Sequence, residues 1–335
     1  MEKAIQLWVG PLPPEHIWIK PANQPKEIAK IVQVYFRKWI VHPLKRHAAK
    51  YYLTVLRSLF GLQVIGITGS FGKTSTKEIL LSILSQSGPT VASYANIDPV
   101  YNIPTTILKC SSKTKYLILE MGIEYPGEMN FYMWLAPVDI AVITGIGLTH
   151  TEFLNNTENI YTEKSQITRH AKYVVDYSKK PPSLTSHLEI TSQVARILHI
   201  SQADIETGLA SFTPPPHRMH RINHPSGAII IDDSYNANPT AVKLTLEALV
   251  DMAQKENKTP VFVFGQMNEL GRYEVSSHQE IGKLIAEYQI KHLLCLGTAT
   301  KYTIQAAGTG KLYPSQEKLR SEAKKFLTSK YIILI

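Results

Sequence analysis

The sequence is poor in cysteine and has no long apolar run. Cys110 and Cys295 are the only cysteines among 335 residues, too few for a disulfide framework and compatible with a reducing compartment. No stretch reaches the roughly 18 consecutive apolar residues of a membrane-spanning helix, and the N-terminus lacks the apolar core of a signal peptide. These absences argue against a disulfide-stapled secreted domain and an integral membrane protein, and they predict a cytoplasmic protein.

Length and charge divide the chain into parts. A chain of 335 residues exceeds what one hydrophobic core commonly fills, so we expect two domains and an appendage. Residues 1–60 hold ten Lys or Arg against three Asp or Glu, which accounts for +7 of the net charge of +9 and leaves +2 for the rest. A basic body would indicate nucleic acid, and no such partner is expected here. A basic N-terminal segment instead predicts a local contact with an anionic lipid surface, a partner or an acidic substrate.

The basic N-terminal segment, residues 1–60, has two halves. Residues 1–26 are rich in proline and predict irregular structure, whereas apolar residues from Glu27 to Phe60 recur at helical spacing. Pro43 should break this pattern into two helices. Such helices either lie as an amphipathic pair on a membrane or protein surface, or pack on the next domain with a solvated basic face. The sequence leaves both interpretations of residues 27–60 open.

A βα rhythm begins at Gly61 and predicts an α/β fold. The central domain, expected over residues 61–213, should be a P-loop-type parallel sheet with crossover helices. Its strands are expected at 63–68, 116–120, 140–144 and 173–175, and its helices near 74–87, 127–135, 157–169, 187–199 and 202–212. After the stiff run Pro214-Pro215-Pro216, a smaller Rossmann-like α/β domain is expected over residues 214–335. Its strands are expected at 228–231, 260–264, 293–296 and 331–335, and its helices near 239–254, 276–288 and 315–328.

A glycine-rich turn separates the first expected strand from the helix after it, and its sequence is Thr68-Gly69-Ser70-Phe71-Gly72-Lys73-Thr74-Ser75. It matches a short phosphate-binding pattern, T-G-x-x-G-K-T. In such a turn backbone N–H groups and the helix N-terminus face an anion, the lysine reaches the outer phosphates, and the next hydroxyl can hold Mg²⁺. The motif alone also fits a plain turn, so the prediction of nucleotide binding depends on the strand–turn–helix context.

Polar residues also gather where other expected strands end. Glu120 closes the strand at 116–120, where a carboxylate beside phosphates can hold Mg²⁺ or can simply cap the following turn. His150 and Lys164, taken alone, fit ordinary surface residues. Asn238 before a proline fits a helix N-cap, but a cap does not explain the other polar residues crowded at the same strand end: Asp232, Asp233 and Asn236.

Taken in order, these pieces resemble the Mur ligases, the ATP-dependent amide-forming family of peptidoglycan synthesis, and in particular the members that add D-alanyl-D-alanine. The resemblance covers about residues 61–300. Its pieces are T-G-S-F-G-K-T at 68–74, Asn96 ahead of I-P-T-T at 103–106, E-M-G-I-E-Y-P-G-E at 120–128, His150, Lys164, Arg218, D-D-S-Y-N-A-N-P at 232–239 and G-Q-M-N-E-L-G at 265–271.

The resemblance implies ATP and two Mg²⁺ ions as cofactors. Lys73 would contact the β- and γ-phosphates, and Thr74 and Glu120 would hold the first Mg²⁺. His150 would help to hold the second together with Lys164, which is carbamylated in the family. Arg218 would reach the phosphates and Asn236 the adenine or ribose. The expected catalytic residues are Lys73, Glu120, His150 and Lys164, and the expected ATP-binding residues are the turn 68–75 with Asn96, Arg218, Asp233, Asn236 and Asn238.

The implied reaction is phosphoryl transfer to a carboxylate, followed by attack of an amine on the acyl phosphate. The expected partners are a small-molecule or peptide-linked acceptor and an amino acid or dipeptide, bound by a monomer. The resemblance is weaker on the acceptor side, because the basic residues 1–60 stand where the family has its UDP-sugar domain. A ligase for a different peptide or acid acceptor, and a catalytically degenerate relative that only binds ATP, are therefore the alternatives.

Overall fold

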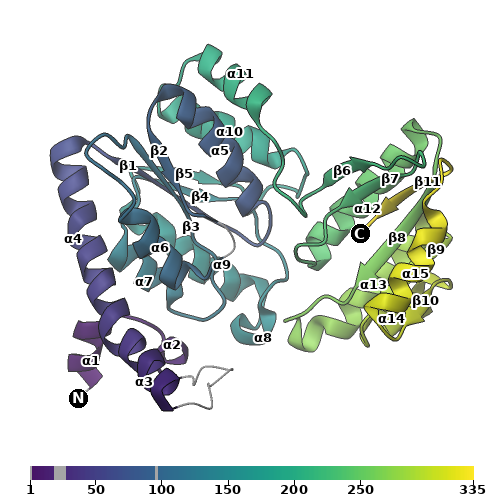
Figure 1. Cartoon of the computed structure of the whole chain (residues 1–335), viewed down its shortest axis with the longest axis horizontal. Coiled ribbons are helices and arrows are strands. Elements are labelled where there is room, and N and C mark those ends of the chain that lie inside the picture. The colour runs from purple at the N-terminus through teal and green to yellow at the C-terminus, as the bar shows by residue number, and fades with distance from the viewer. Residues whose placement is uncertain (1, 19–27, 95–96) are drawn as a thin grey trace. The chain divides into compact units, whose positions relative to one another are not determined.

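The computed structural model describes residues 2–18, 28–94 and 97–335. Its contacts divide the chain into two compact units. The first unit comprises Met1–Ile146, Glu158–Lys180 and Thr185–Phe212. The second comprises Gly147–Thr157, Pro181–Leu184 and Thr213–Ile335. Each unit has its own sheet (Figure 1), as expected for an α/β protein with two lobes. The domain bounds inferred from the sequence stay a prediction.

The first unit is built on a five-stranded parallel sheet in the order β2-β3-β1-β4-β5. Its strands are β1 (Gln63–Thr68), β2 (Thr90–Ala92), β3 (Tyr116–Glu120), β4 (Ile140–Ile143) and β5 (Tyr173–Asp176). One face is covered by α5 (Lys73–Ser87), α10 (Ser186–Ile197) and α11 (Gln202–Ser211), and the other by α6 (Pro99–Ile107), α7 (Glu128–Leu135) and α9 (Thr157–Ser165), which η2 (Gln166–His170) follows (Figure 1). Because helices cover both faces, the central strands read as continuous apolar runs.

The second unit is built on a six-stranded sheet in the order β10-β9-β8-β11-β7-β6. Its strands are β6 (His220–Asn223), β7 (Ile229–Asp232), β8 (Thr259–Gly265), β9 (His292–Leu296), β10 (Lys311–Tyr313) and β11 (Tyr331–Leu334). All neighbours pair in parallel except β6, which pairs antiparallel with β7. Its helices are α8 (Thr151–Leu154), α12 (Pro239–Lys255), α13 (Glu274–Glu287), α14 (Thr300–Ala307) and α15 (Gln316–Ala323), with short 3₁₀ turns η3 (Gly271–Tyr273) and η4 (Lys324–Phe326).

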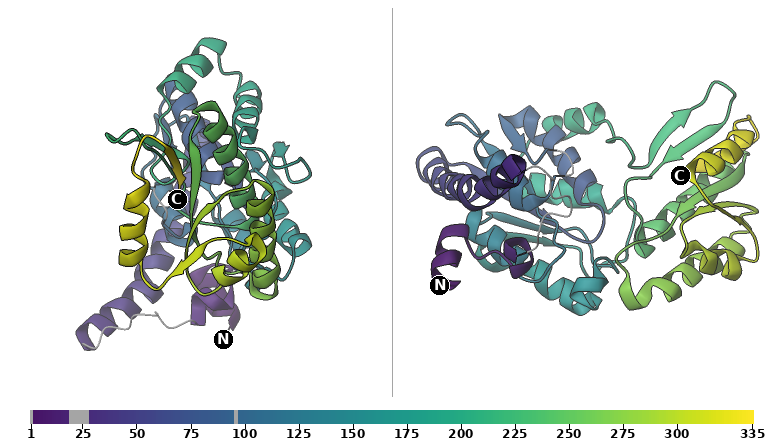
Figure 2. Two further views of the ribbon diagram at one scale, coloured as in Figure 1. Left: turned by 90° about the vertical axis from the view of Figure 1, so that its right-hand side faces the viewer. Right: turned by 60° about the horizontal axis from the view of Figure 1, so that its bottom comes forward.

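Side chains that alternate along the strands of this sheet build two cores. Ile332 and Leu334 of β11 pack in the cluster of α12 and α13. Ile333 between them points to the other face and packs with Leu319 of α15. Figure 2 shows this sheet from two further directions, with α15 on the face opposite to α12 and α13.

The N-terminal segment is more helical than its sequence predicts. The expectation of irregular structure over residues 1–26 is wrong for α1 (Glu2–Val9) and α2 (Pro14–Trp18). The expected break at Pro43 does not occur either, because α3 (Ile28–Phe36) runs through a π-helical turn, η1 (Arg37–Val41), into α4 (His42–Phe60). Proline lacks an N–H and is tolerated in the first turn of a helix. The N–H of His42 donates to the carbonyl of Arg37, five residues back. The helix therefore continues through a π turn into α4, where Pro43 occupies the first turn.

Several short elements of the two sheets and their surroundings were not expected from the sequence. Strands β2 and β10 have three residues each, too few for a periodic pattern. The helix α6 contains Pro104 but begins with two favourable signals, since the side chain of Asp98 accepts the N–H of Val100 and Pro99 occupies the first turn. Among the described helices, none is both long and apolar enough to cross a bilayer.

Candidate functional site

The glycine-rich turn joins β1 to α5 in the first unit, as predicted. Gly69 has φ of +145°, and a Cβ there would lie 2.1 Å from Oγ1 of Thr144. Gly72 has φ of +75° and is the N-cap of α5, so both turn glycines stand where side chains are unfavourable. Nζ of Lys73 donates to the carbonyl of Gly69 at 2.8 Å. The lysine ammonium is thus held across the turn, close to the N-terminus of α5.

Glu120 and Thr74, the two predicted ligands of a first Mg²⁺, are in direct contact. The parallel register pairs Ile67 with Glu120, so the carboxyl end of β3 lies beside the glycine-rich turn. Oγ1 of Thr74 donates to Oε1 of Glu120 at 3.0 Å. A hydroxyl and a carboxylate in contact are oxygen ligands of the kind Mg²⁺ prefers, with phosphate and water oxygens completing the shell. The described residues contain no group of three His, Cys, Asp or Glu side chains that could hold a metal by themselves.

A lysine that the sequence did not single out also reaches this carboxylate. Lys77 lies one turn after Lys73 on α5, and only 1% of its side chain is exposed. Its Nζ lies 3.4 Å from Oε2 of Glu120 and 3.0 Å from Oε1 of Glu78. This ion pair restrains Oε2 of Glu120, while Thr74 contacts Oε1.

Lys164 is buried in the first unit near Lys73. Its side chain is 1% exposed, although a lysine on a helix is commonly solvated. Burial first, and then the charge of Lys73, hold the pKa of Lys164 well below its usual value, while Glu128 and Glu163 oppose that shift. A buried lysine with a lowered pKa exists to a larger extent as a neutral amine. The nitrogen of Lys164 is therefore a better nucleophile than that of a solvated, charged lysine.

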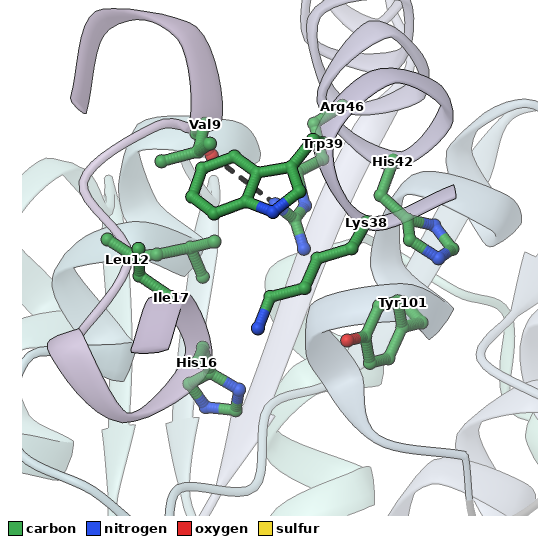
Figure 3. A pocket seen from close by; sticks show the side chains of 9 residues that line it. All are labelled: Val9, Leu12, His16, Ile17, Lys38, Trp39, His42, Arg46 and Tyr101. Atoms are coloured by element: carbon green, nitrogen blue, oxygen red, sulfur yellow. Dashed lines mark hydrogen bonds between the residues drawn. The ribbon is translucent and has the colours of Figure 1, made fainter. Parts of the chain in front are cut away.

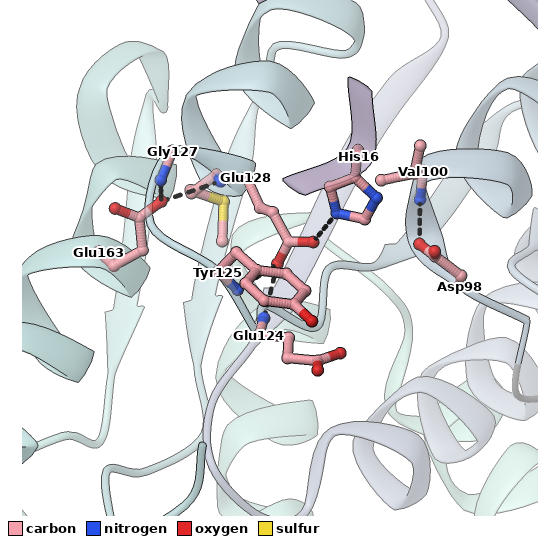
Figure 4. A network of polar contacts seen from close by, with 9 residues as sticks. His16, Asp98, Val100, Glu124, Tyr125, Gly127, Glu128 and Glu163 are labelled. Atoms are coloured by element: carbon pink, nitrogen blue, oxygen red, sulfur yellow. Dashed lines mark hydrogen bonds and ion pairs between the residues drawn. The ribbon is translucent and has the colours of Figure 1, made fainter. Parts of the chain in front are cut away.

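Two buried carboxylates organise the loop after β3 (Figure 4). Sequence reasoning quoted Glu128 only as the end of the motif at 120–128, without a role, and did not name Glu163. Glu128 accepts the N–H groups of Glu124 at 2.5 Å and Tyr125 at 3.0 Å. Glu163 accepts the N–H groups of Gly127 at 2.9 Å and Met129 at 3.1 Å, at the start of α7. Burial raises the pKa of Glu163 despite these bonds. Glu128 and Glu163, whose charges also act on Lys164, therefore hold the loop that begins at Glu120 in place.

The N-terminal segment joins this network through His16 of α2 (Figure 4). The His16 ring pairs with the carboxylate of Glu128. Burial lowers the pKa of His16, but the hydrogen bond and charge of Glu128 outweigh burial, so that the pKa is raised overall. Nothing in the proline-rich sequence around His16 signals this role, because the partner lies 112 residues away.

A small pocket lies where the N-terminal segment meets α6 (Figure 3). Arg46 points into it and is only 4% exposed. Its Nη1 donates to the carbonyl of Val9 at 3.4 Å, and its guanidinium lies over the rings of Tyr101 and Phe131. Burial lowers the pKa of Arg46 to about 10, so it stays charged at neutral pH. The basic residues of this segment are thus not all solvated. The lining comprises Val9, Leu12, His16, Ile17, Lys38, Trp39, His42, Arg46 and Tyr101.

His150 belongs to the second unit, where it contacts another predicted motif. It has φ of +53° and precedes α8. Its Nδ1 lies 2.5 Å from Oε2 of Glu269 in the G-Q-M-N-E-L-G stretch, and this contact above all lowers the pKa of Glu269. Thr151 donates to the carbonyl of Leu270 at 2.9 Å. The histidine loop and the glycine-containing motif, 119 residues apart for this last pair, therefore form one local structure.

The polar cluster after β7 is also local to the second unit. Burial raises the pKa of Asp233 to about 6, although its Oδ1 accepts the N–H of Met219 at 3.0 Å. Asn238 caps α12, with its Oδ1 accepting the N–H of Ala241 at 3.0 Å, which is the role that its position before Pro239 predicts. Asn236 is exposed.

Arg218, another residue of the expected ATP-binding set, lies beside this cluster, and its charge opposes the rise in the pKa of Asp233. The guanidinium of Arg218 lies 3.8 Å from the centre of the Tyr235 ring. Asn96 lies outside the described residues. Roles of Arg218, Asn96 and the cluster after β7 toward ATP stay predictions.

Comparison with known proteins identifies two family domains in the chain. Residues 67–205 match the Mur ligase middle domain, and residues 217–335 match the domain described as "Mur ligase, glutamate ligase domain". Together these matches span most of the chain and follow the order seen in the sequence.

Curated relatives are about a quarter identical to this chain over the aligned residues. The UDP-N-acetylmuramoyl-tripeptide–D-alanyl-D-alanine ligase of Mycobacterium bovis is 27% identical over 301 residues, which cover 71% of this chain and 59% of the relative. The enzyme of the same name from Bacillus subtilis is 27% identical over 312 residues, which cover 77% of this chain and 67% of the relative. The chain thus spans about three fifths of the length of the first of these relatives.

The fold is also that of solved relatives. The MurF ligase of Thermotoga maritima, solved in complex with ADP, superposes with a TM-score of 0.75 over 88% of this chain and 79% of that one, at 22% identity. This likeness supports the fold, while the two domain matches carry the assignment to a family. The chain belongs to the Mur ligase family and contains its middle domain followed by its C-terminal domain.

Proposed function

We propose that this protein is an ATP- and Mg²⁺-dependent ligase that joins a carboxylate to an amine through an acyl phosphate. The observation that carries the proposal is the contact of Thr74 with Glu120 at the glycine-rich turn, beside the ammonium of Lys73. The names of its relatives support the more specific proposal that it acts in peptidoglycan precursor synthesis and adds D-alanyl-D-alanine. A different peptide or acid acceptor, and a relative that binds ATP without catalysis, are the alternatives.

The turn supplies what a triphosphate needs. Backbone N–H groups of the turn and the N-terminus of α5 attract anionic oxygens, and Lys73 adds a charge that can move from the Gly69 carbonyl to the β- and γ-phosphates. Thr74 and Glu120 would hold a Mg²⁺ ion, which neutralises charge on the transferring phosphoryl group. A second ion at His150 and Lys164, residues of different compact units, stays a prediction.

Lys164 is suited to the carbamylation that we propose for it. A neutral amine nitrogen attacks the carbon of CO₂, a C–N bond forms, and the nitrogen loses a proton to solvent or a base. The product is an anionic carbamate whose oxygens can bind a cation, which an unmodified lysine cannot do. Burial favours the neutral amine by lowering the pKa of Lys164, so the first step is easier here than at an exposed lysine.

The reaction needs positioning and charge neutralisation more than a nucleophilic side chain. An oxygen of the acceptor carboxylate attacks the γ-phosphorus of ATP, and the bond to the β-phosphate oxygen breaks to release ADP. The amine then attacks the acyl carbon, phosphate leaves, and the amine loses a proton. Lys73 stabilises the negative charge that develops on the phosphate oxygens, and the turn keeps the attacking and leaving oxygens aligned. The partners are an acidic acceptor and an amino acid or dipeptide, bound by a cytoplasmic monomer.

The proposal is tested by following phosphate release with candidate acceptors and amines. Wild type should release phosphate when an acceptor, such as UDP-N-acetylmuramoyl-tripeptide, and an amine, such as D-alanyl-D-alanine, are both present. Lys73→Ala should reduce turnover by at least a hundredfold, since it removes a charge-stabilising group. Lys113→Ala is the control, because Lys113 is exposed in the same unit. Equal background release by wild type and Lys73→Ala with every acceptor would leave only the ATP-binding alternative.

A further inference from the structure

An apolar face runs along the outside of the N-terminal helices. Among the described residues, 26 large hydrophobic side chains are exposed, and 11 of these lie between Ile28 and Phe60. Ile28 is 79% exposed and Leu59 is 73% exposed. Packing of the helices on the first unit does not explain large apolar side chains that face solvent to this extent. We call ten of these 11 side chains, all except Phe60, the outer face of α3–α4. They are Ile28, Val32, Tyr35, Phe36, Ile40, Val41, Leu44, Tyr51, Val55 and Leu59.

The helix α4 is apolar on two opposite sides. Ala49, Leu53 and Leu56 are buried and face α6 and α7 of the same unit. Leu44, Tyr51, Val55 and Leu59 are spaced by seven, four and four residues, which places them within an arc of about 80° at 100° per residue. That arc is centred opposite to Leu53. A helix that needed only to pack on its own domain would carry polar residues there.

The views of the fold agree with this division. Figures 1 and 2 show α4 at the outer edge of the first unit, with the sheet and its helices on one side only. No described element of that unit covers the outer face, whose side chains keep the exposures given above. A contiguous apolar surface of this extent marks an interaction site.

The charge of these helices indicates what kind of partner binds the outer face. From Ile28 to Phe60 the sequence has no Asp or Glu, and it has seven basic residues, Lys30, Arg37, Lys38, Lys45, Arg46, Lys50 and Arg57. Arg46 is buried and Arg57 pairs with Asp139 at 2.6 Å, which leaves five of these basic residues. Pairing this helix with a second copy would bring two such sets of positive charge together, and residues 28–60 contain no carboxylate to compensate them. An anionic lipid surface offers the opposite charge and also accepts apolar side chains.

The residue types fit the boundary between headgroups and acyl chains. Tyr35 and Tyr51 are amphipathic rings of the kind enriched at that level. No described helix can cross a bilayer, so the contact is with the surface. We propose that the outer face of α3–α4 binds the surface of a membrane rich in anionic phospholipid, with its apolar side chains entering the acyl boundary and exposed basic residues of the same helices, such as Lys30 and Arg37, contacting phosphates.

The direct test is co-sedimentation of the full chain with vesicles, without ATP or acceptor. We expect binding to vesicles of phosphatidylcholine with 30–40% phosphatidylglycerol (roughly a typical anionic bilayer) and at least tenfold weaker binding to phosphatidylcholine alone. The double variant Val55→Asp/Leu59→Asp should weaken binding more than tenfold. Both side chains are exposed, so the fold is retained, which circular dichroism and thermal unfolding would check.

A matched control has the same change in charge at exposed apolar positions of the second unit. Val275 and Leu312 are 40% and 42% exposed, and Val275→Asp/Leu312→Asp should bind vesicles like wild type. Lys73→Ala should also bind like wild type, so loss of catalysis and loss of membrane binding are separable. Raising salt from 0.1 to 0.5 M should weaken binding, since phosphate contacts are screened.

Three results would overturn the proposal. One is no binding of wild type to anionic vesicles at 0.1 M salt. Another is equal binding by Val55→Asp/Leu59→Asp and the control, which would place the contact elsewhere. The third is a wild-type dimer that Val55→Asp/Leu59→Asp converts to a monomer without any vesicle binding, which would make a second copy the occupant.

Discussion

Replacing Lys164 with methionine should separate a chemical role of this lysine from a structural one. Lys164 is 1% exposed, and burial and Lys73 hold its pKa well below the usual value. Methionine keeps most of the length but needs no hydrogen bond. Burying a polar group costs about 1–3 kcal/mol where hydrogen bonds do not fully compensate its loss of hydration, and methionine avoids that cost. We therefore expect Lys164→Met to be as stable as wild type at pH 7, or more stable by up to ~2 kcal/mol, while ATP turnover falls to background.

The stability difference should depend on pH with a defined sign. In the unfolded chain a lysine has a pKa of about 10.4, whereas the pKa of Lys164 is lowered in the folded chain. Between these two pKa values the unfolded state binds a proton that the folded state lacks, so wild-type stability rises with pH. The rise is at most about 1.4 kcal/mol per pH unit. Any advantage of Lys164→Met should therefore shrink from pH 7 to pH 9.

Two assays check this prediction together. Urea unfolding in CO₂-depleted buffer at pH 7, 8 and 9 gives the stability difference, and ADP formation with acceptor and amine gives turnover. Lys172→Met, at an exposed position, is the control and should change neither. The reasoning is refuted if Lys164→Met loses more than about 3 kcal/mol, the cost of breaking a buried pair, or if it retains turnover.

Two further predictions concern the turn and the N-terminal segment. Gly69→Ala places a Cβ 2.1 Å from Oγ1 of Thr144 at φ of +145°. It should lower the free energy of unfolding by about 1–3 kcal/mol and abolish ATP binding measured by calorimetry. Gly265→Ala, whose Cβ meets nothing within 4 Å, should change neither stability nor ATP binding. The raised pKa of His16 means that its pairing with Glu128 stabilises the fold below about pH 6.5 and that this contribution is lost as pH rises through the raised pKa. The loss of thermal stability in His16→Asn should therefore be larger at pH 6 than at pH 8, and equal losses would contradict a charged pairing.

The sequence predicts the parts of this fold that repeat a simple pattern. Strands β1, β3 and β4 are apolar runs, α5 and α12 have helical spacing, and α12 also has a capping signal at Asn238, so their places were predicted to within a residue or two. The three-residue strands β2 and β10 carry no period. The antiparallel edge strand β6 depends on its pairing with β7, which local sequence does not encode.

The candidate site shows the same division between local and distant information. The contact between Thr74 and Glu120 follows from a parallel sheet, because neighbouring strands end at one edge. The buried partner Lys77 could not be predicted, because a lysine on a helix gives no local sign of burial. His16 and Glu128 lie 112 residues apart, and the N-terminal helices that bring them together were expected to be irregular. Distant pairs of this kind depend on tertiary packing.

The central claim is that the glycine-rich turn holds a triphosphate with Mg²⁺ bound to Thr74 and Glu120. The most direct measurement is the affinity of a non-hydrolysable ATP analogue, titrated by calorimetry with and without 5 mM Mg²⁺ (about a physiological excess). Wild type and Thr74→Ser, which keeps the hydroxyl, should bind the analogue at least tenfold more tightly with Mg²⁺, and Thr74→Ala should lose most of that gain. An equal Mg²⁺ effect in all three proteins, or none in wild type, would contradict the claim.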